Sequence, residues 1–296
     1  MKKITPPLPV KYGVSPNALW LPDGNWSTVY DFFLEKFSHL APEECAKRFD
    51  NNQVVTAKGE ILSLTSRYQS KQHIYFYREL VDETKIPFKE KIIYQDDLIV
   101  IADKPHFLAV APTGQYLQET LLVRLRNQLN LDSLELCHRL DRETAGLVLL
   151  SKQPLTRSHY HALFAEKKIA KTYHALIIKN SQLLPQERKS RLMKGEPFFR
   201  MKEVAGSHNS ETRIKKIEDR RDCTLCELKP ITGKKHQLRV HLAALGRGII
   251  NDSFYPKLIK KESDDFTNPL QLLAKSIEFI DPINGKKHYF ESSFCL

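Results

Sequence analysis

The chain has 296 residues, 41% of them hydrophobic, which is enough for one large domain or two smaller ones. Its formal net charge of +11 favours a polyanionic partner, most often nucleic acid, although a solvated basic surface would give the same count. No apolar run approaches the roughly 18 residues of a membrane span, and the N-terminal MKKITPPLPVKYG lacks the apolar core of a signal peptide, so we expect no membrane association and a cytoplasmic location.

The first 90 residues are predicted to form a small α/β module, because Pro- and Gly-rich stretches there separate short periodic segments. Ser27 or Thr28 is the expected cap of its first helix. The expected elements are an extended arm or loops (6–28), a helix (28–40), a second short helix (42–51), a hairpin around Lys58-Gly59 (53–62), a strand (72–80) and a linker (81–91).

Residues 91–296 are predicted to form the main domain, an α+β fold with a large mixed or antiparallel sheet flanked by helices and loops. The expected strands are 91–105 (two strands and a turn), 146–151 (buried), 171–179, 212–218, 223–230, 270–282 and 286–293. The expected helices are 116–129, 154–168 and 234–246, the last ending at Gly246. Residues 181–210 are polar, and we expect them to be an insertion or a long loop.

The segment LCHRLDRETAGLVLLSK, residues 136–152, places Asp141 between Arg139 and Arg142, just before an apolar run. Positive neighbours favour the ionised form of a carboxyl group, which suits a nucleophile or a proton acceptor and does not suit a general acid. A surface ion pair would look the same. The position in a loop that leads into a buried strand favours a functional role.

Five segments resemble the RluA-type pseudouridine synthase family, in the family's order. HRLDRETAGLVLLSK is similar to HRLDxxTSGLLLLAK, and the other matches are VIADKPHFLAVAP (100–112), KTYHAL (171–176), PITGKKHQLRVHLAALGRGIINDSFY (230–255) and LQLLA (270–274). The N-terminal module resembles a degenerate αL RNA-binding module that lacks the usual run of arginines. The resemblance implies that residues 91–296 are the catalytic domain.

The resemblance also implies an activity: conversion of uridine in structured RNA to pseudouridine, with ribosomal RNA favoured over transfer RNA. It implies no cofactor. Asp141 matches the essential aspartate, which attacks ribose C1′ or removes a ribose proton. Tyr173 matches an aromatic residue that stacks on the uracil, and Arg239 matches the basic partner of the aspartate.

Three substrate-binding residues are expected beside these. Arg139 matches a residue that enters the RNA helix in place of the flipped nucleotide, and Leu272 matches an aliphatic residue that packs against the base. His138 lies in the same loop as Asp141, which we call the active loop. The partner is thus RNA, with no DNA, no membrane, and a monomer as the expected state.

The sequence departs from the family pattern at several motif positions. The family has a glycine after its Lys-Pro pair, whereas this chain has His106-Phe107 there. The family's Gly-Arg-Thr-His is Gly233-Lys234-Lys235-His236 in this chain. No catalytic group is removed, so we expect an active enzyme.

Two other classes of function stay open. A nucleosidase-type glycosyl hydrolase would need a second carboxyl group as general acid. The active loop offers Glu143, which we expect to face outward. A non-catalytic RNA-binding protein would explain the charge but would not need the Asp–Tyr–Arg set.

A metal site is not expected. His236 and His241 are five residues apart, which does not place them well on one helix face. Cys223 and Cys226 have the spacing of half a zinc site, but no second pair completes it, and the segment alternates like a strand that packs in the core. The odd, scattered set of five cysteines does not indicate a disulfide framework and fits a reducing cytoplasm.

Overall fold

The computed structural model describes residues 6–79, 82–179, 184–260 and 265–296. The chain divides into two compact units, Met1–Glu83 and Thr84–Leu296, at a point inside the expected linker. None of the helices formed by the described residues has the length and apolar content needed to cross a membrane.

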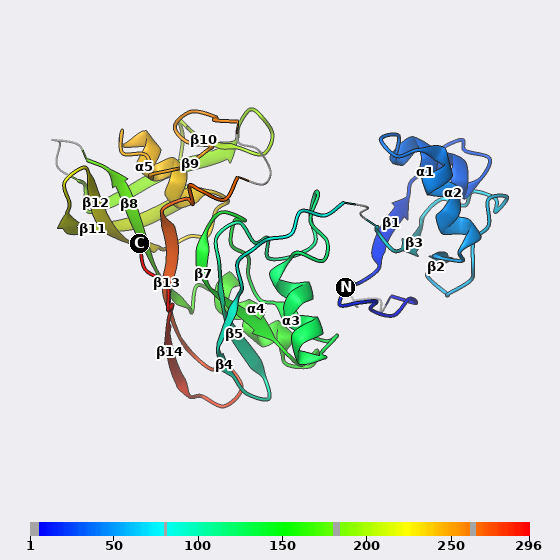
Figure 1. Ribbon diagram of the computed structural model, residues 1–296, viewed down its shortest axis with the longest axis horizontal. Coiled ribbons are helices and arrows are strands. Elements are labelled where there is room, and N and C mark those ends of the chain that lie inside the picture. Colours follow the sequence, from blue (N-terminus) through cyan, green and yellow to red (C-terminus); the bar gives the residue numbers. More distant parts are fainter. Residues whose placement is uncertain (1–5, 80–81, 180–183, 261–264) are drawn as a thin grey trace. The chain divides into compact units, whose positions relative to one another are not determined.

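The first unit packs two helices against one face of a small antiparallel sheet (Figure 1). Its elements are β1 (Asn17–Leu21), α1 (Val29–Lys36), α2 (Pro42–Asp50), β2 (Val54–Thr56) and β3 (Gln72–Phe76), with the strand order β1-β3-β2. Thr28 is the cap of α1, since its hydroxyl accepts from the Asp31 amide while the Asp31 carboxylate accepts from the Thr28 amide. The predicted helices and hairpin are confirmed.

The expected arm of the first unit contains a strand that the sequence did not indicate. Residues 17–21 form β1, which pairs with β3 in antiparallel register, Trp20 opposite His73. The partner strand lies about fifty residues further along the chain, so no local pattern reveals the pairing. The prediction of an extended arm or loops for residues 6–28 missed this paired strand.

The second unit is built on an 11-stranded mixed sheet. Its strands are β4 (Lys91–Gln95), β5 (Ile99–Lys104), β6 (Glu135–Leu136), β7 (Ala145–Ser151), β8 (Ala170–Ile178), β9 (Glu187–Lys194), β10 (Met201–Val204), β11 (Ser210–Asp219), β12 (Cys223–Pro230), β13 (Leu272–Ile280) and β14 (Lys287–Glu291). The order is β10-β9-β11-β12-β8-β13-β7-β5-β4, with β14 paired to β13 and β6 to β7. The expected α+β class with a large mixed sheet is confirmed.

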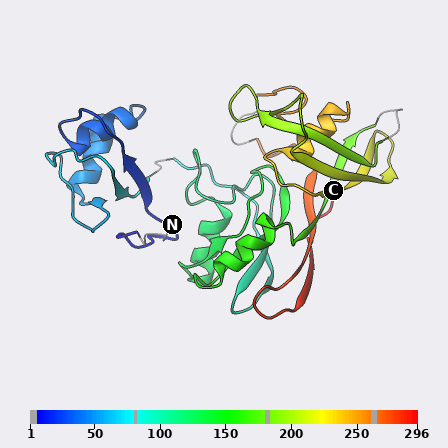
Figure 2. The same cartoon turned by 180° about the vertical axis from the view of Figure 1, so that it is seen from behind.

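Helices cover this sheet in two separate regions (Figures 1 and 2). Helices α3 (Leu121–Leu129) and α4 (Arg157–Ala165) pack on opposite faces of β5 and β7, because successive residues of these strands enter different core clusters. Every residue of β7 is buried, as its continuous apolar run predicted. Helix α5 (Gln237–Ala244) packs near β9 to β12, and Gly246 follows its end with a φ of +68°.

The polar segment expected to be an insertion or long loop is mostly sheet. Strands β9 and β10 pair with each other, and β9 also pairs with β11, which extends the sheet to its edge. The prediction was wrong because five of the eight residues of β9 are charged and only Leu192 is buried, so the strand has little apolar signal. Residues 180–183, at the start of that segment, lie outside the described residues.

Gly146 lies at the point where β7, which follows the active loop, pairs with β13. Strand β7 runs parallel to β13 with Gly146 opposite Ala274. Gly146 has a φ of +113°, and a Cβ placed there would lie 2.2 Å from the Ala274 carbonyl oxygen. Only glycine permits this close approach. The loop that carries Asp141 is thereby fixed next to the start of β13.

Candidate active site

A cavity of about 1650 Å³ opens between the loop before β7, the loop before α5, and strands β8, β12 and β13. It exceeds the roughly 300–1,000 Å³ of pockets for small molecules, so it suits part of a polymer. Only four acidic residues line it, so basic residues predominate. The basic residues of the lining are Arg139, Lys167, Lys168, Lys171, Arg213, Lys229, Lys234, Lys235, Arg239, Lys275 and Lys287. Such a wall attracts phosphates.

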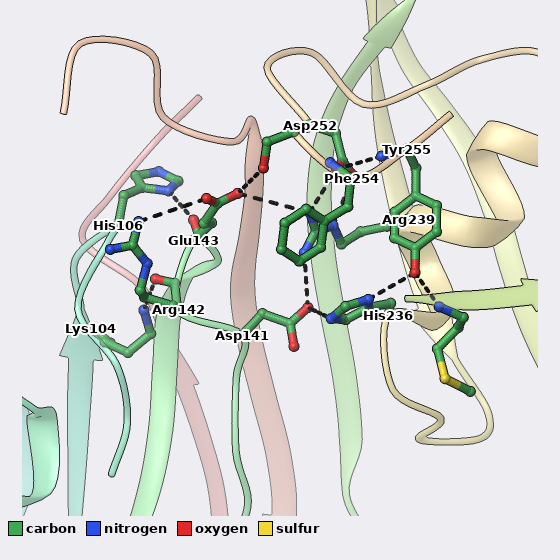
Figure 3. Close-up of polar contacts among 12 residues, drawn as sticks. Lys104, His106, Asp141, Arg142, Glu143, His236, Arg239, Asp252, Phe254 and Tyr255 are labelled. Atoms are coloured by element: carbon green, nitrogen blue, oxygen red, sulfur yellow. Dashed lines mark hydrogen bonds and ion pairs between the residues drawn. The ribbon is translucent and has the colours of Figure 1, made fainter. Parts of the chain in front are cut away.

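Asp141 lies in this cavity with its side chain about one quarter exposed. Its Oδ2 is 3.4 Å from Arg239 Nη1 and 3.7 Å from His236 Nε2 (Figure 3). One oxygen of the carboxylate thus faces both a permanent cation and an imidazole, and the side chain stays partly open to the cavity. This arrangement suits a group that must reach a substrate atom in its charged form.

Arg239 is fixed by carboxylates on several sides. Its side chain is 2% exposed, Nε donates to Asp252 Oδ2 at 2.8 Å, and Nη2 donates to Asp252 Oδ1 at 2.6 Å. Glu143 Oε2 lies 3.8 Å from Nη2. Burial alone would lower the pKa of Arg239, but Asp252, Asp141 and Glu143 raise it above its usual value. A permanent positive charge therefore faces Asp141.

The bidentate pair is covered by two aromatic rings. The Arg239 guanidinium lies 4.9 Å from the ring centre of Phe254 and 5.5 Å from that of Tyr255. The backbone amides of both residues donate to Asp252 Oδ1. Residues 252–255 therefore form one turn that binds the arginine by charge and by cation–π contact.

His236 connects Asp141 to a second part of the sheet. The Met201 amide donates to the Tyr255 hydroxyl at 2.6 Å, and this hydroxyl lies 2.9 Å from His236 Nδ1. Because the hydroxyl accepts from the amide, its own proton is available for Nδ1, which leaves the proton of a neutral imidazole on Nε2, facing Asp141. Burial lowers the pKa of His236 to about 4, which favours this neutral form.

The active loop is anchored through its carbonyl groups. Lys104 is fully buried, and its Nζ donates to the carbonyls of Pro105 (2.9 Å), Leu108 (2.8 Å) and Arg142 (3.0 Å). His106 Nδ1 lies 2.7 Å from the Glu143 carbonyl oxygen. Burial lowers the pKa of Lys104 to about 7, with Asp141 and Glu143 opposing the shift. Two successive carbonyls after Asp141 are thus fixed by the last residue of β5 and by the segment that follows it.

The two arginines that flank Asp141 in the sequence do not act alike. Arg142 donates to the Tyr116 hydroxyl and lies over the rings of Tyr116 and Phe107, at 5.2 and 5.9 Å. Arg139 is exposed and lines the cavity. The arginine that the structure places against Asp141 is Arg239, 98 residues away in the chain, and the effect of Arg139 and Arg142 on Asp141 stays a prediction.

Tyr173 and Leu272 form the apolar side of the cavity. Tyr173 is half-buried on β8, and burial together with the charge of Asp141 raises its pKa above the usual value. Leu272 begins β13, is 3% exposed and belongs to the core cluster against which Tyr173 packs. A planar base placed between the ring and Asp141 would meet an aromatic face.

His138 lines the cavity but has polar and aromatic partners of its own. Its Nε2 accepts from the Leu149 amide at 3.1 Å, and its ring stacks on Phe164 with centres 4.4 Å apart. Burial, and then the charge of Lys171, lowers its pKa to about 3. These contacts indicate that His138 positions the loop, while substrate binding by His138 stays a prediction.

Glu143 does not face outward as expected. Its side chain is 13% exposed, close to Arg239, and Oε2 accepts from the Ser253 hydroxyl at 3.2 Å. The prediction was wrong because the side-chain directions of Asp141 and Glu143 are not related in a loop, whereas residues two apart in a strand point to the same face. Glu143, Asp252, Tyr255 and Lys104 all lie in the motifs quoted above, but only the structure gives them contacts.

The possible metal ligands are not brought together. His241 lies between Thr212, Ser190 and Ser210, whereas His236 contacts Tyr255 and Asp141. Cys226 is fully buried in a core cluster, and burial raises its pKa to about 11. Within the described part of the chain, no group of three or more His, Cys, Asp or Glu residues is arranged to hold a metal ion.

Comparisons with known proteins agree with this geometry. Residues 98–244 match the family described as RNA pseudouridylate synthase. The chain is 32% identical over 203 residues to a ribosomal large subunit pseudouridine synthase C of Vibrio cholerae, covering 66% of this chain and 63% of that protein. It is 31% identical over 228 residues to a tRNA pseudouridine synthase C of Vibrio parahaemolyticus, covering 70% of this chain and 91% of that protein.

A solved structure shares the fold over most of this chain. The structure of human RNA pseudouridylate synthase domain containing 1 aligns with a TM-score of 0.57 at 20% identity, covering 70% of this chain and 84% of that one. The family match includes Asp141, Tyr173 and Arg239. The chain belongs to the RluA-like RNA pseudouridylate synthase family.

Proposed function

We propose that this protein is an RNA pseudouridine synthase that isomerises uridine in structured RNA without a cofactor. The observation that carries the proposal is the position of Asp141, open to a basic cavity and 3.4 Å from an arginine that Asp252 fixes. Tyr173 and Leu272 on the apolar side of the same cavity supply the surface for a base. The relatives act, by their names, on ribosomal and transfer RNA.

The chemistry requires that one glycosidic bond is exchanged for another. The bond from uracil N1 to ribose C1′ breaks, and a bond from C5 to C1′ forms. The proton of C5 is released to solvent, while N1 gains one. Asp141 carries the step at the ribose, by attack on C1′ or by removal of a ribose proton. Arg239 places a positive charge beside it in a site that the RNA closes.

The base must leave the RNA stack before it reaches Asp141. Arg139 is exposed at the cavity and no ion pair of it is found among the described residues, so its planar guanidinium is available to fill the vacated position. Tyr173 then stacks on the flipped uracil and Leu272 packs against it. His138 keeps the active loop in place through Leu149 and Phe164.

Ribosomal RNA is the favoured target over transfer RNA, in a protein that acts as a monomer on RNA and not on DNA. The support is the relative of Vibrio cholerae named for the large ribosomal subunit. The chain matches 63% of that protein's length. All five cysteines are free, which supports a reducing cytoplasm as the place of action.

The first unit is proposed to position the RNA. Its residues 1–83 contain equal numbers of acidic and basic residues, so the net charge of +11 resides in residues 84–296. Its sheet carries Trp20, 47% exposed, with its ring 4.8 Å from that of His73. Exposed rings of this kind stack on unpaired bases with little demand on charge.

The test is an isomerase assay on RNA labelled with tritium at uridine C5, with wild-type protein and the Asp141→Asn variant. Wild type should release tritium and form pseudouridine, and the variant should lose activity by more than about a thousandfold while binding RNA within a few-fold. The amide keeps the shape of Asp141 but cannot act as nucleophile or base. Free uracil would instead indicate a nucleosidase, and binding without release of either product would indicate a pure RNA-binding protein.

A further inference from the structure

Among the lysines of the cavity wall, Lys171 is the half-buried one for which the described residues provide no acidic partner. Lys229, Lys275 and Lys287 pair with Glu227, Glu291 and Glu278, at 3.1, 2.9 and 2.7 Å. For Lys171 Nζ, the described residues provide no carboxylate within 4.0 Å and no hydrogen-bond acceptor. Yet its side chain is half-buried, in contrast to the exposed Lys234 and Lys235 nearby.

No acidic group compensates the charge of Lys171 in its half-buried position. A Cβ placed on Gly233 would lie 3.8 Å from Nζ, so the glycine loop before α5 passes beside the ammonium group and leaves it uncovered. Burial lowers the pKa of Lys171 with no acidic group opposing the shift. The charge of Lys171 in turn lowers the pKa of His138. A half-buried cation without an anion destabilises the folded protein, so its place here needs a reason beyond stability.

The place of Lys171 suggests that reason. It lies on β8 two residues before Tyr173, and residues two apart on a strand point to the same face, about 6.6 Å apart. That separation is comparable with the distance between a base and the phosphate of its own nucleotide. We infer that Lys171 binds the backbone phosphate adjoining the uridine that stacks on Tyr173, which rests on the proposed function of the cavity.

The first test measures RNA binding by the Lys171→Met and Lys171→Arg variants. The methionine variant should bind an RNA containing the target uridine about tenfold more weakly, and the slope of log K against log salt should fall by about 0.7–0.9, the value for one phosphate contact. The arginine variant should keep the slope. Lys215→Met is the matched control, since Lys215 is exposed on β11 outside the cavity.

Thermal unfolding separates a binding role from a structural one. Removal of an unpaired, half-buried charge should leave the midpoint of Lys171→Met equal to or above that of wild type. A clear drop in the midpoint together with an unchanged salt slope would mean that Lys171 stabilises the fold, and would overturn the inference.

The second test replaces one phosphate of the RNA by a neutral methylphosphonate, 5′ or 3′ of the target uridine. One of the two substitutions should weaken binding by wild type about tenfold and should have no further effect on Lys171→Met. Equal losses for wild type and variant at both positions would contradict the assignment. Because binding is read without turnover, these results stand apart from the isomerase assay, whose failure alone would refute the proposed function.

Discussion

Asp252 holds Arg239 through two hydrogen bonds, of 2.8 Å to Nε and 2.6 Å to Nη2, while Nη1 points at Asp141 (Figure 3). Nε and Nη2 of the arginine thus bind Asp252, which orients the guanidinium, while Nη1 is directed to the candidate catalytic group. The side chain of Asp252 is itself fully buried and accepts hydrogen bonds from the backbone amides of Phe254 and Tyr255. The orientation of Arg239 is set before any RNA binds.

Asp252→Asn should therefore lower turnover without touching the substrate. An asparagine accepts through one oxygen only, so Arg239 loses half of its bidentate pair and its orientation towards Asp141. We expect the single-turnover rate to fall by about 10²- to 10³-fold, with RNA affinity within a few-fold of wild type. Asp222→Asn, the same change at an exposed position, serves as the matched control. A full rate in Asp252→Asn would show that the pair does not orient Arg239.

Gly146→Ala should disrupt the crossing of β7 and β13. The new methyl group would lie 2.2 Å from the Ala274 carbonyl oxygen, and the backbone has a φ of +113°, so both strain and collision oppose alanine. We expect a loss of more than about 3 kcal/mol of unfolding free energy, measured by urea unfolding. Gly114→Ala is the matched control, because it also has a positive φ but no atom within 4 Å of the added methyl. Equal losses in the two variants would assign the effect to backbone strain alone.

Stability should fall as the pH drops from about 6.5 towards 4. Burial lowers the pKa of His236 and of His241 to about 4, whereas a histidine in the unfolded chain titrates near 6.5. Between these values the unfolded chain binds more protons, so protonation favours unfolding. Each of the two residues, 8% and 0% exposed, should cost about 1–2 kcal/mol at pH 5 relative to pH 7.

Urea unfolding at pH 7 and pH 5 measures this effect. The carboxyl groups contribute little to the difference, because their pKa values in the unfolded chain, near 4, lie below this window. His161→Gln, an exposed position, should leave the difference unchanged, and His241→Gln should reduce it. An unfolding free energy equal at the two pH values would contradict the buried, neutral state of these histidines.

The sequence predicted the elements whose signal is local. The apolar run of β7, the Thr28 cap of α1 and the Gly246 stop of α5 each depend on neighbouring residues, and all three are confirmed. Strands β1 and β9 were missed because they owe their place to partners far along the chain, and their own residues are mostly exposed. Helix α3 begins at Leu121, later than its apolar repeat suggested, and Leu117 is buried in the preceding loop.

The site shows the same division. The motifs place Asp141, Tyr173 and Arg239 in one family pattern, and the structure places all three on one cavity. The contacts that orient them, from Asp252 to Arg239 and from Tyr255 to His236, depend on how loops fold back over 13 and 19 residues. No periodicity encodes such contacts, so side-chain direction in loops, as for Glu143 and Arg142, could not be predicted.

Removal of residues 1–83 should separate positioning from electrostatic attraction. These residues carry no net charge, and the basic cavity lies wholly in residues 84–296. Each phosphate contact contributes about 0.7–0.9 to the slope of log K against log salt, so the truncated protein should lose no more than about one or two units of slope. Its single-turnover rate should fall much more on the natural RNA than on a short stem-loop that contains the target uridine.

Trp20→Ala in the full chain tests whether base stacking accounts for that loss. The ring is 47% exposed beside His73, and stacking on a base contributes about 1–3 kcal/mol. The variant should weaken binding to the natural RNA by about 5- to 100-fold and leave the short stem-loop unaffected, whereas Tyr12→Ala, more exposed at 74% but outside the sheet, is the control. If the truncated protein loses most of its salt slope, the first unit is the main electrostatic anchor. If the truncated protein treats both RNAs as wild type does, the first unit has no part in recognition and the exposed Trp20 ring serves another purpose.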